Sequence, residues 1–177
     1  MKLKETTKTS ETIYDGKIIK VQRDVAILEN GAEAIREVVR HPGGVGVVAM
    51  DNDGYIYLVR QFRYPFYETT LEIPAGKLDH KGEDTRDAGV RELREETGLV
   101  ADCVEYLGTF FATPGFCDEK LSIYLATRLH QGETDPDDDE FVECEKYHIT
   151  EAVEMIERGE IKDAKTVIGI LMTKNKL

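Results

Sequence analysis

The sequence has few cysteines, no tryptophan and no long hydrophobic segment, and these shortages exclude several classes of protein. Its three cysteines lie far apart and form no CxxC pair, so they indicate reduced thiols rather than a zinc site or a disulfide framework. The longest apolar stretch, residues 45–50, is far too short to span a bilayer. The first ten residues, MKLKETTKTS, lack the apolar core of a signal peptide. We therefore expect a cytoplasmic protein.

Positive charge is also scarce. The chain of 177 residues has 23 Lys and Arg against 35 Asp and Glu, which gives a formal net charge of −12. This excess argues against a surface for nucleic acid or for an anionic membrane, because both depend on clustered cations. An anionic small-molecule substrate would have to be met by local cations or by a metal ion. The hydrophobic fraction of 41% and the charged fraction of 33% are typical of a globular chain that buries a proper core.

A capped helix is predicted between Asp84 and Gly98. Asp84 has the side chain of an N-cap residue, and Gly98 stands where a left-handed C-cap glycine belongs. Between these ends Val90, Leu93 and Thr97 recur at helical spacing, so we expect them to face the core.

Three carboxylates share another side of this helix. Glu92, Glu95 and Glu96 are three and four residues apart, and like charges at such spacing repel by about a few tenths of a kcal/mol per pair. Water and the neighbouring Arg91 and Arg94 could relieve this repulsion, as on an ordinary solvated helix. A divalent metal ion could also relieve it, because Mg²⁺ and Mn²⁺ prefer oxygen ligands. The carboxylates alone leave both readings open.

The spacing of the whole stretch 76–99 resembles the Nudix box, the signature of hydrolases that cleave nucleoside diphosphates linked to another group. Gly76 opens the pattern, Glu83 follows, and after seven further residues comes the run RELREETGL, which starts at Arg91. Every specified position from Glu83 onwards matches. The loop departs from the family by one residue, because six residues rather than five separate Gly76 from Glu83. We expect residues 79–81 to absorb this insertion.

Three stretches outside the box resemble the ADP-ribose pyrophosphatase branch of the family: residues 58–63 (LVRQFR), 71–76 (LEIPAG) and 113–119 (TPGFCDE). The resemblance implies a Mg²⁺-dependent hydrolase, with Mn²⁺ able to substitute, that splits ADP-ribose into AMP and ribose 5-phosphate. Two alternatives stay open. One is a Nudix hydrolase of another nucleoside diphosphate sugar or of a dinucleotide. The other is a Nudix module that senses a nucleotide without cutting it, although such modules usually lose the box carboxylates.

The resemblance also implies roles for the box residues. Glu92 and Glu96 are the expected principal metal ligands, and the carbonyl of Ala75 is a further one. Glu95 is expected to share a metal or to hold Arg91 in place, and Glu95 and Glu96 are both candidates for the catalytic step. An ion pair between Glu83 and Arg91 is expected to orient the helix and its loop.

In the ADP-ribose branch the general base comes from a loop outside the box, and residues 137–140 (DDDE) occupy the matching place. By resemblance, Glu140 approaches a metal and Asp138 stands at the position of the base. Some members have a glutamate there, and the side chain of Asp138 is shorter. A solvated surface loop is the competing interpretation of this acidic run.

Four further residues are candidates for contact with the substrate. Arg63, at the end of its strand, is expected to bind a phosphate. Arg36 is a second candidate, which could reach into the site of a partner subunit. Glu119 and Glu72 are expected to accept hydrogen bonds from ribose hydroxyls or to support the metal site. Each of the four could equally form an ordinary surface ion pair, and the resemblance favours Arg63 and Glu119.

The overall pattern predicts a mixed α/β (α+β) fold, in which a mixed central sheet is sandwiched between helices, as in the Nudix fold. Patches 18–21, 25–28 and 34–40 predict an N-terminal antiparallel sheet. The resemblance implies that residues 1–40 form this sheet and build a homodimer, while residues 41–177 form the Nudix hydrolase domain.

A hairpin turn is expected at residues 51–54. Thr150 is the predicted N-cap of a helix that ends at 156, and a last helix is expected at about 163–172. Strands are predicted at residues 44–50, 55–63, 69–73, 104–111, 120–126 and 141–147.

Overall fold

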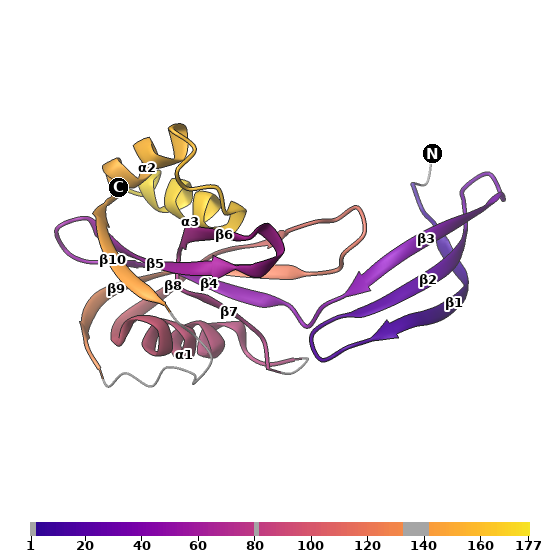
Figure 1. Ribbon diagram of the computed structural model, residues 1–177, viewed down its shortest axis with the longest axis horizontal. Helices are drawn as coiled ribbons and strands as arrows, with labels where there is room; N and C mark the ends of the chain where they lie inside the picture. The colour runs from indigo at the N-terminus through magenta and orange to yellow at the C-terminus, as the bar shows by residue number, and fades with distance from the viewer. Residues whose placement is uncertain (1–2, 80–81, 133–141) are drawn as a thin grey trace. The chain divides into compact units, whose positions relative to one another are not determined.

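The computed structural model describes residues 3–79, 82–132 and 142–177. The chain divides into two compact units, each described here by itself. Unit 1 consists of Met1–Gly43 and Phe111–Lys120, and unit 2 consists of Gly44–Phe110 and Leu121–Leu177. Figure 1 follows the chain through both units by colour, from the indigo strands of unit 1 to the yellow C-terminal helix of unit 2. Among the described residues, no helix has both the length and the apolar character needed to cross a membrane.

Unit 1 is built on a three-stranded antiparallel sheet in the order β1–β2–β3, as predicted. The patches expected at 18–21 and 25–28 prove to be one strand, since residues 20–27 are continuous. Strand β1 was not expected, because its sequence TTKTSETIYD is polar and every residue in it is exposed, so it shows no apolar alternation. The strands are β1 (Thr6–Asp15), β2 (Lys20–Ile27) and β3 (Glu33–Arg40).

The segment 111–120 is tied to the end of β3 within unit 1. Val39 forms an isolated parallel bridge with Cys117, and its amide donates a hydrogen bond to the carbonyl of Phe116 at 2.7 Å. The carboxylate of Asp118 accepts from the amide of His41 at 2.8 Å and from Nη1 of Arg40 at 3.1 Å. These contacts fix the position of the residues that follow Asp118.

Unit 2 contains a mixed seven-stranded sheet in the order β10–β5–β4–β9–β8, with β6 paired to β5 and β7 paired to β4. β4 runs parallel to β9 and antiparallel to β5 and β7. The predicted strands are present, although β8 begins five residues earlier than expected, directly after Gly98, and β9 continues to Gln131 instead of ending at Ala126. The short strand β7 was not predicted. The strands are β4 (Gly44–Met50), β5 (Tyr55–Arg63), β6 (Glu68–Glu72), β7 (Ala75–Lys77), β8 (Leu99–Phe111), β9 (Lys120–Gln131) and β10 (Glu143–His148).

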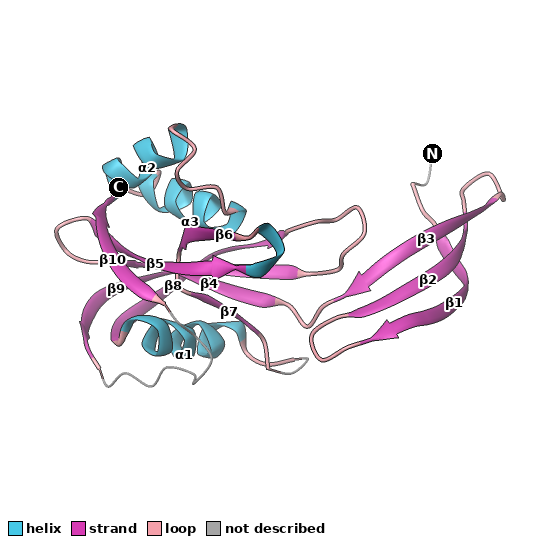
Figure 2. Ribbon diagram, in the orientation of Figure 1, coloured by secondary structure: helices cyan, strands magenta, loops and turns pink. Residues whose placement is uncertain are grey.

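Helices cover both faces of this sheet (Figures 1 and 2), which confirms the predicted mixed α/β sandwich. Helix α1 (Thr85–Thr97) lies on one face, and α2 (Ile149–Glu157) and α3 (Ala164–Lys174) lie on the other. All seven residues of β4 are buried. Val45 and Val47 belong to the hydrophobic cluster on the α1 side, whereas Val48 belongs to the cluster on the α2–α3 side. A strand buried on both faces has no polar positions, which explains the unbroken apolar run.

The predicted caps of α1 are confirmed, but its core face differs from the prediction. Asp84 accepts hydrogen bonds from the second and third amides of the helix, and Gly98 ends it with a left-handed φ of 70°. Leu93 is buried in the core as expected. Val90 and Thr97 are only half-buried, because the strip that meets the sheet passes through smaller residues such as Ala88 instead.

The predicted N-cap of α2 is wrong. The helix begins at Ile149, one residue before Thr150, and His148 is the capping residue. Nδ1 of His148 accepts a hydrogen bond from the amide of Thr150 at 3.4 Å. A histidine in extended conformation can therefore replace the serine, threonine or aspartate that usually occupies this position. For α3 the expected start is confirmed, since Asp163 is its N-cap.

We predict that Gly169→Ala lowers the free energy of unfolding, although alanine normally stabilises a helix interior by about 1 kcal/mol relative to glycine. A Cβ at Gly169 would lie 2.8 Å from Cγ2 of Val48 and 3.3 Å from Cδ1 of Ile73. The expected net loss is about 1–2 kcal/mol, measured by urea unfolding. Gly115→Ala is the control, since a Cβ there meets nothing within 4 Å. A Gly169→Ala variant as stable as wild type would contradict the tight packing of α3 on β4.

Candidate functional site

Helix α1 brings two carboxylates into the interior of unit 2. Glu92 and Glu96 are only 6% and 7% exposed, although both are ionisable. One oxygen of Glu96 accepts a hydrogen bond from the amide of Ala75 at 2.8 Å. Buried carboxylates need compensating donors or cations, and here the first donor is the backbone at the start of β7.

Gly76 allows the carboxylate of Glu92 to approach the backbone of β7. A Cβ at this position would lie 2.1 Å from the carboxyl carbon of Glu92, a separation that no real pair of atoms adopts. Any side chain at Gly76 would therefore displace Glu92. The first glycine of the sequence pattern is explained by this close approach rather than by an unusual backbone angle.

Arg91 joins the acidic residues of the helix and its loop. Its Nη1 lies 2.8 Å from Glu92 and 3.0 Å from Glu95. Its Nη2 lies 3.7 Å from Glu83, so the expected pair between Arg91 and Glu83 is confirmed. Glu83 also accepts a hydrogen bond from the amide of Asp79 at 2.6 Å, which ties the loop with the extra residue to the helix.

The residues expected to bind a metal carry the oxygen atoms that a hard divalent cation prefers. They are the carboxylates of Glu92, Glu95 and Glu96 on α1 and the backbone carbonyl of Ala75 on β7. Oxygen donors of this kind suit Mg²⁺ or Mn²⁺. In the described ranges, no three His, Cys, Asp or Glu side chains are already gathered in the geometry of a metal site. Glu92 and Glu95 each contact Arg91 through one carboxylate oxygen.

A second charged group lies at the end of β5. Arg63 donates two hydrogen bonds to the buried carboxylate of Glu72, from Nε at 2.7 Å and from Nη2 at 2.6 Å. These bonds raise the pKa of the Arg63 guanidinium above its usual value against the opposing effect of burial, and the negative charges of Glu72, Asp163 and Glu96 add to the rise. Arg63 is thus within electrostatic reach of Glu96 on α1.

The first turn of α3 completes this group, and sequence reasoning missed it. Lys165 donates hydrogen bonds to Glu72 and to Asp163, the latter at 2.9 Å. The hydroxyl of Thr166 donates to Asp163 at 2.6 Å and accepts from the amide of Ile73 at 2.9 Å. One feature of the sequence could have indicated this group. Lys165 lies in the first turn of a helix, where the helix dipole disfavours positive charge.

Glu72 is a strongly stabilised anion. Burial raises its pKa, but hydrogen bonds from Arg63, the charge and hydrogen bond of Lys165, and a hydrogen bond from Thr70 outweigh burial and lower the pKa to about 2. Since the side chain is 2% exposed and already accepts from three groups, its expected contact with a ribose hydroxyl stays a prediction.

The remaining predicted residues lie elsewhere. Arg36, in unit 1, forms a bidentate pair with Glu5 at 2.9 and 2.7 Å. Glu119, also in unit 1, lies 3.5 Å from Nδ1 of His41. Asp138 and Glu140, the predicted base and further metal ligand, lie outside the described residues, so their roles stay predictions.

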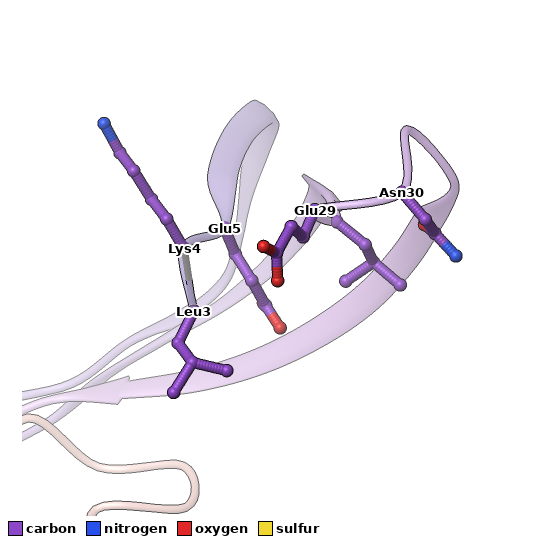
Figure 3. A pocket seen from close by; sticks show the side chains of 6 residues that line it. Leu3, Lys4, Glu5, Glu29 and Asn30 are labelled. Carbon is purple, nitrogen blue, oxygen red and sulfur yellow. The ribbon is translucent and has the colours of Figure 1, made fainter. Parts of the chain in front are cut away.

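Unit 1 has a hollow of its own, shown in Figure 3. Leu3, Lys4 and Glu5 line one side, and residues 28–30 line the other. None of the described candidate site residues lines it, and the carboxylate of Glu5 is engaged by Arg36. The hollow therefore belongs to the structure of unit 1 and is not part of the charged site in unit 2.

We predict that Glu72→Gln lowers the free energy of unfolding by about 2–3 kcal/mol at pH 7. The folded pKa of about 2 lies below the ordinary value of 4.5. The stabilisation is therefore complete above about pH 4.5 and is lost as the pH falls through about 2. Urea unfolding at pH 7 and at pH 3 should show the difference between variant and wild type shrinking to about half.

Glu68→Gln is the matched control for this measurement, because Glu68 lies on the same strand with its side chain 49% exposed. We expect it to change stability by less than about 1 kcal/mol at either pH. A Glu72→Gln difference that does not depend on pH would show that packing, not ionisation, is the main contribution of this residue.

Comparisons with known proteins identify the family to which this fold and these box residues belong. The NUDIX domain family matches residues 40–168, and the nucleoside diphosphate sugar hydrolase N-terminal domain matches residues 5–39. A methanol dehydrogenase activator from Bacillus methanolicus is 43% identical over 168 residues, covering 94% of this chain and 90% of the relative. An ADP-ribose pyrophosphatase from Bacillus subtilis (strain 168) is 41% identical over 170 residues, covering 95% and 91%.

A further ADP-ribose pyrophosphatase, from Mycobacterium tuberculosis, is 39% identical over 167 residues and covers 93% of this chain and 81% of the relative. Among solved structures, a crystal structure of an ADP compounds hydrolase superposes with a TM-score of 0.86 over 98% of this chain and 94% of that chain. Its identity is 22%, so it shows the fold alone, which is the predicted one. With the box residues of α1 and the family match over most of its length, the chain belongs to the NUDIX domain family.

Proposed function

We propose that this protein is a Nudix pyrophosphohydrolase that splits ADP-ribose into AMP and ribose 5-phosphate, with Mg²⁺ as cofactor and Mn²⁺ able to replace it. The observation that carries the proposal is the pair of buried carboxylates, Glu92 and Glu96, packed against Ala75 and Gly76 with Arg63 in electrostatic reach of Glu96. The substrate comes from the relatives named ADP-ribose pyrophosphatase, which align over nearly the whole chain.

Glu92, Glu95, Glu96 and the carbonyl of Ala75 would hold the metal. When bound, a divalent ion neutralises phosphate charge and lowers the pKa of a coordinated water. The residues of the chain contribute position and electrostatics. Gly76 leaves room for Glu92, and the amide of Ala75 orients Glu96 through its 2.8 Å hydrogen bond.

Arg63 would bind a phosphate of the substrate. Glu72 fixes the guanidinium through two hydrogen bonds, so little side-chain entropy is lost when the anion binds. Glu119 would accept a hydrogen bond from a ribose hydroxyl. For the proton of the attacking water, we infer that Asp138 is the base and that Glu140 supports the metal, by resemblance to the branch.

We predict that wild type releases AMP and ribose 5-phosphate from ADP-ribose in the presence of Mg²⁺, and that Glu96→Gln lowers kcat/KM by at least about a hundredfold. The amide keeps the shape of the side chain but removes the charge that would bind the metal. Asp87→Asn is the control, because Asp87 lies on the same helix with a 77% exposed side chain. Products are identified by chromatography, and circular dichroism checks the fold.

Near-wild-type turnover in Glu96→Gln would exclude this residue as a metal ligand. Faster hydrolysis of GDP-mannose or NADH than of ADP-ribose would retain the chemistry but change the substrate. GDP-mannose is a pertinent competitor, since a GDP-mannose pyrophosphatase from Yersinia enterocolitica is 33% identical over 153 residues. Tight binding of ADP-ribose without any product would instead indicate a nucleotide sensor.

We also infer that the protein is a cytoplasmic homodimer that binds no nucleic acid, and that residues 1–40 form the subunit interface, with residues 41–177 as the hydrolase domain. Arg36 would then contact substrate in the partner subunit's site. In support, the unit 1 sheet exposes the large apolar side chains of Ile13 (57%), Tyr14 (57%) and Ile35 (47%), and Ile18 (53%) is exposed in the connection between β1 and β2. A three-stranded sheet gains stability when such side chains are covered.

Sedimentation velocity tests this inference. We expect the full chain to sediment with twice its mass of 20.0 kDa. Ile35→Glu should shift the population towards monomer, because it places a charge in the interface. Leu171→Glu, a similar change at a 39% exposed position on α3, should leave the dimer intact. A wild-type monomer at micromolar concentration would contradict the dimer.

A further inference from the structure

Lys165 is a buried lysine in an unfavourable place. It occupies the first turn of α3, where the positive end of the helix dipole disfavours a cation. Its side chain is only 9% exposed, and burying an ammonium group is costly unless it is paired. Because the helix dipole and burial both disfavour the charged lysine, contacts with residues outside the helix must stabilise it.

The contacts of Lys165 supply that reason. Its ammonium donates hydrogen bonds to Glu72 and to Asp163. Asp163 already has a structural role, since it caps α3 by accepting from the amide and the hydroxyl of Thr166 at 2.9 and 2.6 Å. The cap therefore does not require Lys165. Glu72 is the other partner, and it is the residue that holds Arg63.

Arg63, Glu72, Asp163 and Lys165 form a charged cluster, and its net charge is zero only when Lys165 is present. Arg63 and Lys165 contribute two positive charges, and Glu72 and Asp163 contribute two negative ones, so the cluster is neutral. Without Lys165 its net charge would be −1, in a region of low solvent access where charge interactions are strengthened. Arg63 would then be the only cation in the cluster to neutralise the carboxylates of Glu72 and Asp163.

Arg63 keeps one end of its guanidinium available. Nε and Nη2 are held by Glu72, and the side chain is 39% exposed. Over the ranges that the structure describes, Nη1 of Arg63 makes no hydrogen bond with the protein. A guanidinium fixed on one edge and accessible on the other is suited to bind an anion such as a diphosphate.

We propose that Lys165 is a positioning residue for the diphosphate of the substrate. Lys165 satisfies the carboxylate of Glu72, so that Glu72 can orient Arg63 without cancelling its charge. The proposal rests on the proposed function, because it takes a nucleoside diphosphate as the ligand of Arg63. Since Lys165 acts through Arg63 on an anion that is present before and during the reaction, its loss should weaken binding more than it slows turnover.

The test compares Lys165→Met with Lys162→Met. Lys162 lies three residues upstream, pairs with Glu68 at 2.6 Å and is 59% exposed, so its replacement removes the same charge without touching the cluster. For Lys165→Met we expect KM for ADP-ribose to rise about tenfold while kcat changes less than about threefold. Lys162→Met should leave both within about twofold of wild type.

Binding of ADP, measured by isothermal titration calorimetry, gives a second readout that needs no turnover. Lys165→Met should bind ADP about tenfold more weakly than wild type and Lys162→Met. If wild type does not hydrolyse ADP-ribose, the proposed function fails, but this comparison still decides the role of Lys165. Should Lys165→Met not fold, Lys165→Gln takes its place, because it keeps a hydrogen-bond donor for Glu72 and lacks the charge.

Unchanged KM and unchanged ADP affinity in a folded Lys165 variant would overturn the proposal. A fall in kcat that matches the folded fraction, with KM at the wild-type value, would also overturn it, since that is the result of a purely structural role. A weaker affinity for ADP together with a raised KM would support it.

Discussion

Negative charge in the interior of unit 2 is the constraint on which its structure depends. An unpaired buried carboxylate costs about several kcal/mol, yet Glu72, Glu92 and Glu96 are all almost completely buried. Arg63 and Lys165 compensate Glu72, and Arg91 lies against Glu92. The group around Glu72 draws its residues from β5, β6 and α3. Its charges are therefore balanced only when the sheet and its helices are assembled.

The compensating contacts converge on one short backbone segment, residues 72–77. From one face of the sheet, Thr166 on α3 accepts a hydrogen bond from the amide of Ile73. From the other face, Glu96 on α1 accepts from the amide of Ala75. Helices on opposite faces thus hold neighbouring peptide groups. Such double support keeps the carbonyl of Ala75 and the carboxylates of α1 in register, as a site that positions a phosphate must be.

Unit 1 differs from unit 2 in that its charged and apolar side chains are largely exposed. Its ion pairs, such as Arg36 with Glu5 and Lys8 with Glu33, join exposed side chains and so add little stability. Its sheet shows apolar residues to solvent, and β1 is exposed throughout. A strand without a buried face carries no alternation, which is why sequence patterns did not reveal it. Only antiparallel pairing with β2, which is interrupted by two register shifts, makes this polar segment a strand.

The sequence by itself determined what depends on near neighbours in the chain. The caps of α1 follow from the residue types at its two ends, and the shared side of Glu92 and Glu96 follows from helical spacing. The pair of Glu83 with Arg91 was implied by the resemblance to the Nudix box. The tertiary structure alone decided which cations meet which buried anions. Nothing in the local sequence joins Lys165 to Glu72, 93 residues away, because electrostatic partners are chosen by distance in space, and that distance exists only after the sheet and α3 have packed together.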